Sequence, residues 1–175
     1  MKSSFILLTL LLLCNLANAK LLISPKEAMQ ENFPQSTQII KKQISLSAKE
    51  LKEIQNKAHV KLRKKSYTLF IARKDDKNIG YGILINKKVR SKNGVILYLI
   101  ADDKLQGIEI IAFNEPQEYL PNKKWQEQFQ NRQTDQMLHL TKEIPTITGA
   151  TLSAKSIVES SRIAFALYNT KIKGK

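Results

Sequence analysis

The spacing of hydrophobic and polar residues predicts two helices near the start of the chain. The segment 24–32 opens with the letters SPKE, a hydroxyl N-cap followed by proline in the first turn and by glutamate three positions after the cap. It predicts a short helix that ends before Pro34. The letters SAKE at 47–50 repeat this device, and the apolar positions after them recur with helical spacing to about Lys61. We therefore interpret residues 20–64 as an N-terminal helical segment.

From Ser66 onward the pattern changes to short β-like runs. Aromatic, branched and other apolar residues dominate each run, and short polar turns such as the letters SKNG at 91–94 separate them. The run at 95–101 is almost entirely apolar, as in a strand that is covered on both faces. Four consecutive strands with short turns predict an antiparallel meander. Their ranges are 67–73, 79–88, 95–101 and 105–113.

The remainder of the chain predicts helices packed on this sheet. Asn122 is placed to cap a helix in which Trp125 and Phe129 share one face. A longer helix is expected over about 152–168, because small and apolar residues form a continuous stripe along it. The predicted fold class is α+β, an antiparallel meander sheet packed by a C-terminal helix, and residues 65–175 form its main domain.

The first nineteen residues have the features of an export signal. Lys2 precedes an apolar run, and the letters ANA at 17–19 match a small-x-small cleavage site, so the mature chain is expected to begin at Lys20. An alternative is lipoprotein processing, in which Cys14 is lipidated and retained. We expect an exported protein, located in the periplasm or at the outer face of the cytoplasmic membrane.

Charge and composition narrow the classes of partner and of chemistry. The chain has 29 basic and 15 acidic side chains, and removal of Lys2 leaves the mature part at a net charge of +13. This balance favours acidic partners, phosphate groups or a membrane surface. Nucleic acid is not expected, because the chain has an export signal and its lysines are not interleaved with stacking aromatic residues. No catalytic or metal-binding set is expected, since the mature part has no cysteine and neither His59 nor His139 has an evident partner.

The letters TGATLS at 148–153 stand immediately before the last predicted helix. On local grounds they describe a glycine turn and a hydroxyl cap. Together with a second region, however, they resemble the small FMN-binding domain family, which includes the periplasmic flavin-carrying subunits of the sodium-pumping quinone reductase and of related electron-transfer complexes. The motif Thr148-Gly149-Ala150-Thr151 is similar to that family's flavinylation motif. The second region is similar to the family's strand, Glu-Pro loop and aromatic-x-x-Gln-Phe segment, and it runs from Gly107 through Glu115-Pro116, Tyr119, Trp125 and Gln128-Phe129.

The resemblance implies a covalently bound cofactor. In the family, FMN is joined by a phosphoester to the threonine of the motif, which is Thr151 here, and a separate flavin transferase installs it from FAD. Gly149 and Ala150 leave room for the donor, and a helix N-terminus can bind the phosphate. Ser153 ranks second as the acceptor and is expected instead to cap the helix or bind the phosphate.

Further contacts follow from the same resemblance. Thr148 and Lys142 are candidate phosphate contacts, and Tyr119 or Trp125 is a candidate to lie against the flavin ring. One position departs from the pattern: Pro145 stands where family members often have aspartate, with Glu143 nearby.

The leading hypothesis is an exported electron carrier that holds FMN on Thr151 and exchanges electrons with a membrane-bound electron-transfer protein. Two alternatives remain open at this point. One is a basic, non-redox module that binds an acidic partner or a membrane surface, and the other is a flavin-dependent reductase with its own small-molecule substrate.

Overall fold

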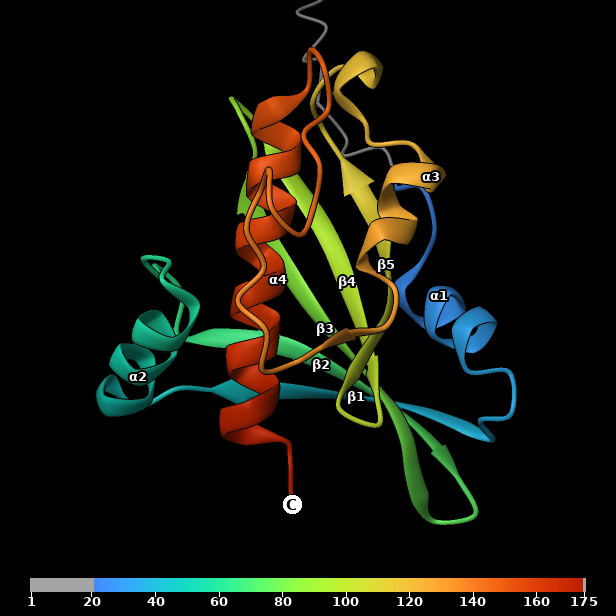
Figure 1. Ribbon diagram of the computed structural model, residues 1–175. Coiled ribbons are helices and arrows are strands. Elements are labelled where there is room, and N and C mark those ends of the chain that lie inside the picture. The colour runs from blue at the N-terminus through green and yellow to red at the C-terminus, as the bar shows by residue number, and fades with distance from the viewer. Residues whose placement is uncertain (1–20, 175) are drawn as a thin grey trace, which may run out of the picture.

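Six antiparallel strands form one sheet, and their spatial order follows their order in the chain (Figure 1). The computed structural model describes residues 21–174. The four predicted strands are all present, with short turns between them, and the α+β prediction is confirmed. The strands are β1 (Gln38–Ser45), β2 (Ser66–Lys74), β3 (Lys77–Lys88), β4 (Asn93–Ala101), β5 (Lys104–Phe113) and β6 (Arg132–Gln133).

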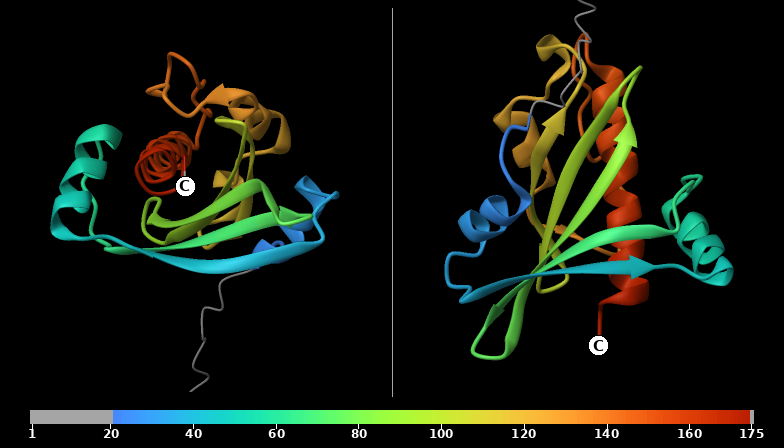
Figure 2. Two further views of the ribbon diagram at one scale, coloured as in Figure 1. Left: turned by 90° about the horizontal axis from the view of Figure 1, so that it is seen from below. Right: turned by 180° about the vertical axis from the view of Figure 1, so that it is seen from behind.

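The long helix α4 (Thr151–Lys171) covers one face of the sheet (Figure 2). Strand β4 shows how the two faces differ: Ile96, Tyr98 and Ile100 belong to the core beneath α4, whereas Leu97 and Leu99 belong to a second core on the other face. All five are fully buried. The prediction that this strand is covered on both faces is therefore correct.

The two N-terminal helices form where their capping signals predict them. Helix α1 (Pro25–Asn32) begins after Ser24, whose hydroxyl accepts the Glu27 N–H at 3.1 Å, and it packs on the face opposite α4. Helix α2 (Ala48–Ala58) begins with a complete capping box between Ser47 and Glu50. It packs against α4 at the sheet edge, where Lys171 donates a hydrogen bond to Glu50.

Some elements differ from the sequence expectation. Strand β1 lies within the segment interpreted as helical, and it pairs with β2 along its whole length. The predicted helix around Trp125 is broken into α3 (Lys123–Gln126) and the 3₁₀ turn η2 (Glu127–Phe129), which follow another 3₁₀ turn, η1 (Gln117–Tyr119). The domain boundary at residue 65 stays a prediction.

The proposed export signal, its cleavage site and Cys14 lie outside the described residues. Within 21–174, no helix has both the length and the apolar character needed to cross a membrane.

Candidate functional site

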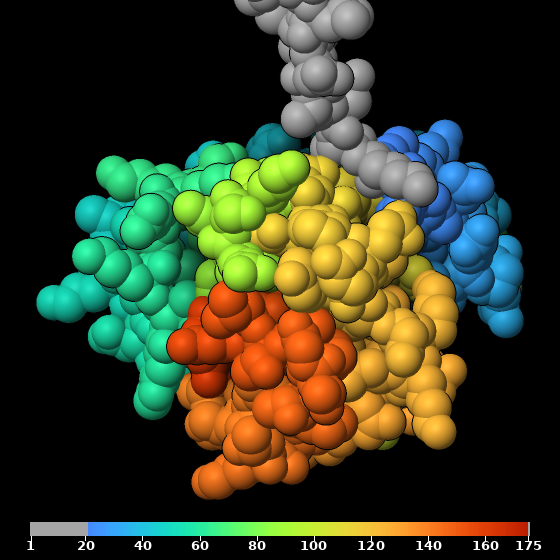
Figure 3. Space-filling model, turned by 90° about the horizontal axis from the view of Figure 1, so that it is seen from above, coloured from blue at the N-terminus to red at the C-terminus, as the bar shows by residue number. Residues whose placement is uncertain are grey.

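The start of α4 lies at one end of the sheet, beside two loops that come from other parts of the chain. Figure 3 looks onto this end, where the orange start of α4 adjoins the green β3–β4 turn and the gold segment that follows β5. A cavity of about 310 Å³ opens between them. Its lining consists of Arg90, Glu115, Tyr119 and the five residues from Gly149 to Ser153.

The first turn of α4 presents backbone N–H groups without a side-chain cap. Gly149 has a φ of 78°, a conformation that favours glycine, and it turns the chain into the helix. Ala150 occupies the N-cap position and makes no capping hydrogen bond with its side chain. The N–H groups of a helix's first turn have no partner within the helix, and the helix dipole is positive at this end. The start of α4 is therefore suited to an anion such as a phosphate.

Thr151 is the first residue of α4, and its side chain is exposed. Its hydroxyl donates to the Ile147 carbonyl at 3.5 Å, a long and weak hydrogen bond. An incoming group could reach this oxygen without breaking a strong internal contact. Ser153, by contrast, is 2% exposed. Ser153 does not cap α4, because the helix begins two residues before it. The other expectation for Ser153, that it binds the phosphate, stays a prediction.

Arg90 brings a positive charge to the same cavity. Its guanidinium donates from Nη1 to the Tyr119 hydroxyl at 3.1 Å and lies 5.4 Å from the centroid of the Tyr119 ring. A guanidinium held in this way can form charge-assisted hydrogen bonds to a phosphate. The sequence interpretation did not include Arg90, which precedes Thr151 by sixty-one residues and approaches it only through the register of the sheet.

Glu115 fixes the turn that carries Arg90. Its Oε1 accepts the backbone N–H groups of Arg90, Ser91 and Lys92 at 2.5 to 3.0 Å, and its Oε2 accepts the Ser91 hydroxyl at 3.1 Å. Burial opposes ionisation of this carboxyl, but the four hydrogen bonds outweigh it and lower the pKa of Glu115. Glu115 is thus a charged residue with a structural role. This role gives a physical reason for the glutamate of the Glu115-Pro116 landmark.

The other predicted phosphate contacts do not line this cavity. Thr148 and Lys142 are both exposed and are not among its lining residues. Of the two aromatic candidates, Tyr119 lines the cavity. Trp125 is 8% exposed, packs edge-on against Phe129 with ring centroids 5.3 Å apart, and belongs to the main core.

Pro145, where the sequence resemblance leads one to expect aspartate, contacts Trp125 through its backbone. Pro145 is exposed, and its carbonyl accepts the Trp125 indole N–H at 2.8 Å. The nearby carboxylate of Glu143 accepts the backbone N–H of His139 at 2.7 Å and lies 3.4 Å from His139 Nδ1. His139 therefore does have a partner, contrary to the sequence interpretation. These contacts lower the pKa of Glu143, and the backbone hydrogen bond from His139 has the largest effect.

Comparison with protein families agrees with this geometry. The model of the FMN-binding domain family matches residues 91–166. This chain carries an FMN-binding domain. The match contains Glu115, Tyr119 and the start of α4, and it begins one residue after Arg90. A search of curated proteins found no match to this chain.

The residues that line the cavity around Thr151 fit the phosphate end of FMN. The uncapped N–H groups of α4 and the Arg90 guanidinium are the donors and the positive charge that such a group requires. The space around Gly149 is open, since a Cβ added there would meet no atom within 4 Å. Among residues 21–174, no three His, Cys, Asp or Glu side chains are grouped so as to hold a metal ion.

Proposed function

We propose that this protein is an exported electron carrier with FMN joined through a phosphoester to Thr151. One observation carries the proposal: the exposed Thr151 hydroxyl lies at the uncapped start of α4, in a cavity that also contains Arg90, within a chain that has an FMN-binding domain. The carrier exchanges electrons with a membrane-bound electron-transfer protein at the outer face of the cytoplasmic membrane.

The attachment reaction is a transfer from FAD that a separate flavin transferase catalyses. The Thr151 oxygen attacks the phosphorus on the riboflavin side of FAD, and the bond from that phosphorus to the bridging pyrophosphate oxygen breaks. AMP leaves, and the hydroxyl proton is released. No electrons are exchanged in this step, so no oxidant or reductant is required.

Several of the groups that line the cavity would then help to hold the phosphodiester. The N–H groups at the start of α4 and the Arg90 guanidinium would stabilise its negative charge. Glu115 holds the turn that places Arg90, and the Tyr119 hydroxyl accepts a hydrogen bond from the guanidinium. Bound FMN supplies the redox chemistry, exchanging one or two electrons, while the protein positions it and tunes its surroundings.

The surface around Thr151 suits transient contact with other proteins. Leu152, the next residue, is 50% exposed although it is apolar. An exposed apolar side chain beside an attachment site can contact the transferase first and the redox partner later. The mature chain's net charge of +13 favours a partner with an acidic surface or a membrane that carries anionic lipids.

The attachment is tested by co-expressing the mature chain with a flavin transferase and measuring flavin fluorescence in a denaturing gel. We expect a fluorescent band for the wild-type chain and for Thr151→Ser, and none for Thr151→Ala. Thr148→Ala is the matched control, because it removes an exposed hydroxyl three residues away that does not line the cavity. Loss of fluorescence in Ser153→Ala but not in Thr151→Ala would transfer the attachment to Ser153, and a dark wild-type band would refute the covalent bond.

The electron-relay part is tested separately with the flavinylated protein. When it is mixed with reduced membranes in the absence of oxygen, we expect its visible flavin absorbance to bleach, and no bleaching with membranes stripped of protein. Turnover of a small-molecule substrate with no protein partner would instead indicate a reductase.

A further inference from the structure

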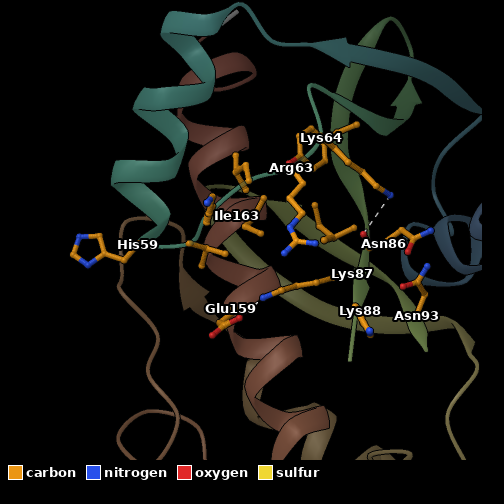
Figure 4. Close-up of a pocket in the computed structure, with 14 residues that line it drawn as sticks. His59, Arg63, Lys64, Asn86, Lys87, Lys88, Asn93, Glu159 and Ile163 are labelled. Carbon is orange, nitrogen blue, oxygen red and sulfur yellow. Dashed lines mark hydrogen bonds and ion pairs between the residues drawn. The ribbon is translucent and has the colours of Figure 1, made fainter. Parts of the chain in front are cut away.

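A second and larger cavity, of about 510 Å³, lies between the loop that follows α2, the end of β3 and the middle of α4 (Figure 4). None of its lining residues belongs to the cavity around Thr151. Two of its lining residues, Glu159 and Ile163, belong to α4, and the nearer one, Glu159, lies eight residues beyond Thr151, which corresponds to about 12 Å along a helix. The two cavities are therefore separate sites on one helix.

The floor of this second cavity is apolar. Leu62, Tyr67, Ile85 and Ile163 line it, and each is at most 8% exposed. These side chains come from four different elements and form part of the main core. A ligand with an apolar body would bury surface against them, whereas an inorganic anion would make no use of them.

Cationic side chains surround this floor. The lining contains five lysine or arginine residues and one carboxylate, that of Glu159, which is paired with Lys87. Lys64 donates to the Asn86 carbonyl at 3.5 Å. In Figure 4, Arg63 extends into the cavity toward Lys87, while His59 points away from it. Within residues 21–174 the guanidinium of Arg63 has no hydrogen-bond or ion-pair partner, so it can bind an anion that enters.

The wall that carries Arg63 is held in place by Gln55. The Gln55 side-chain oxygen accepts the Leu62 N–H at 2.8 Å, and its backbone carbonyl accepts the Val60 N–H at 3.4 Å. His59 ends α2 with a φ of 50°, a left-handed conformation that turns the chain into this loop. The loop is therefore fixed before any ligand binds, which lowers the entropic cost of binding.

We propose that this cavity binds an amphipathic aromatic carboxylate. The aromatic body lies on the apolar floor, and the carboxylate accepts hydrogen bonds from Arg63. Three observations support this class of ligand together: the volume is within the range of small-molecule sites, the floor is apolar, and the positive charges exceed the negative ones. The proposal concerns a site separate from Thr151 and does not rest on flavin attachment.

The test uses 2-naphthoate as the probe and the ¹⁵N-labelled mature chain. In an NMR titration we expect amide shifts concentrated at residues 59–64 and 85–88. The uncharged 2-naphthamide should bind at least about tenfold more weakly, because an ionic hydrogen bond typically contributes enough for that factor. This ligand control uses the wild-type protein, so it does not depend on the folding of any variant.

Variants then locate the charge that binds the carboxylate. Arg63→Gln should weaken 2-naphthoate binding about tenfold, and Arg63→Lys should weaken it less. Lys52→Gln is the control, since Lys52 is exposed on α2, lies outside the cavity and carries the same charge. Equal affinity for 2-naphthoate and 2-naphthamide, equal effects of Arg63→Gln and Lys52→Gln, or shifts centred on Thr151 would each overturn the proposal.

Discussion

Replacement of Glu115 tests whether one buried carboxylate organises the cavity around Thr151. Three backbone N–H groups converge on Oε1, and the Ser91 hydroxyl reaches Oε2. Glutamine keeps one oxygen for the three N–H groups but removes the charge, whereas alanine removes all four hydrogen bonds. The two variants therefore separate the effect of charge from that of hydrogen bonding.

The expected magnitudes follow from these contacts. Hydrogen bonds to charged groups contribute about 1.5 to 3 kcal/mol each and neutral ones about 1 kcal/mol. The donors belong to a turn in which Ser91 and Lys92 are exposed, so water replaces part of what is lost. We expect Glu115→Gln to lower the free energy of unfolding by about 1 to 2 kcal/mol and Glu115→Ala by about 2 to 4 kcal/mol at pH 7.

Urea unfolding of the mature chain measures both values. Glu118→Gln is the matched control: Glu118 is three residues away, exposed, and makes no side-chain hydrogen bond within the described residues, so a change within about 0.5 kcal/mol is expected. Equal effects of Glu115→Gln and Glu118→Gln would show that the charge of Glu115 does not hold the turn.

The pH dependence gives a second test of the same charge. The folded state lowers the pKa of Glu115 below its ordinary value of 4.5. Its stabilising effect is therefore complete above pH 4.5 and is lost as the pH falls from there through the lowered pKa. The difference in stability between the wild-type chain and Glu115→Gln should shrink over this range. A difference that stays constant to pH 3 would contradict the reasoning.

Three further predictions concern the flavin site and the core. In a Thr151→Ala background, Arg90→Gln should weaken non-covalent FMN binding about tenfold in a fluorescence titration, while Arg63→Gln should leave it unchanged. Gly80→Ala places a Cβ 2.2 Å from the Phe33 ring and should lower the free energy of unfolding by about 1 to 3 kcal/mol, whereas Gly107→Ala meets nothing within 4 Å and should cost under about 1 kcal/mol. Pro145→Asp introduces, at an exposed position, the carboxylate that the sequence resemblance leads one to expect. We expect this variant to accept flavin on Thr151 faster in a gel time course. An unchanged or slower rate would show that the transferase does not require this carboxylate.

Much of the fold could be predicted because its signals are local. The capping letters at Ser24 and Ser47 act within one helical turn, and the turns between β2 and β5 act within a few residues. Strand β1 was missed for the opposite reason. It lies at the edge of the sheet, where Lys41 and Lys42 face solvent, so its sequence has little apolar alternation and it is stabilised by pairing with β2.

The residues of the candidate site also differ in whether the signal for them in the sequence is local. Thr151 and Gly149 could be predicted because the motif is contiguous in the sequence. Arg90 could not, because only the pairing of β3 with β4 and of β4 with β5 brings its turn to the start of α4. One signal in the sequence could have pointed to the turn that carries Arg90. Glu115 is an acidic residue just after a buried strand, and a buried carboxylate needs several hydrogen-bond donors. The nearest candidates are backbone N–H groups of a turn at the same end of the sheet.

The position of Thr151 on α4 has a consequence for how a flavin would be held. Thirteen of the helix's 21 residues are buried, and Tyr98 ties it to the sheet through a hydrogen bond from its hydroxyl to the Ile157 carbonyl at 2.8 Å. The Thr151 hydroxyl is thus exposed at the end of a helix that is itself fixed in the core. Sites on such elements are placed more accurately than sites on loops. A flavin on Thr151 would therefore have its phosphate fixed by the fold, and both the transferase and the redox partner would have to approach this one end of the sheet.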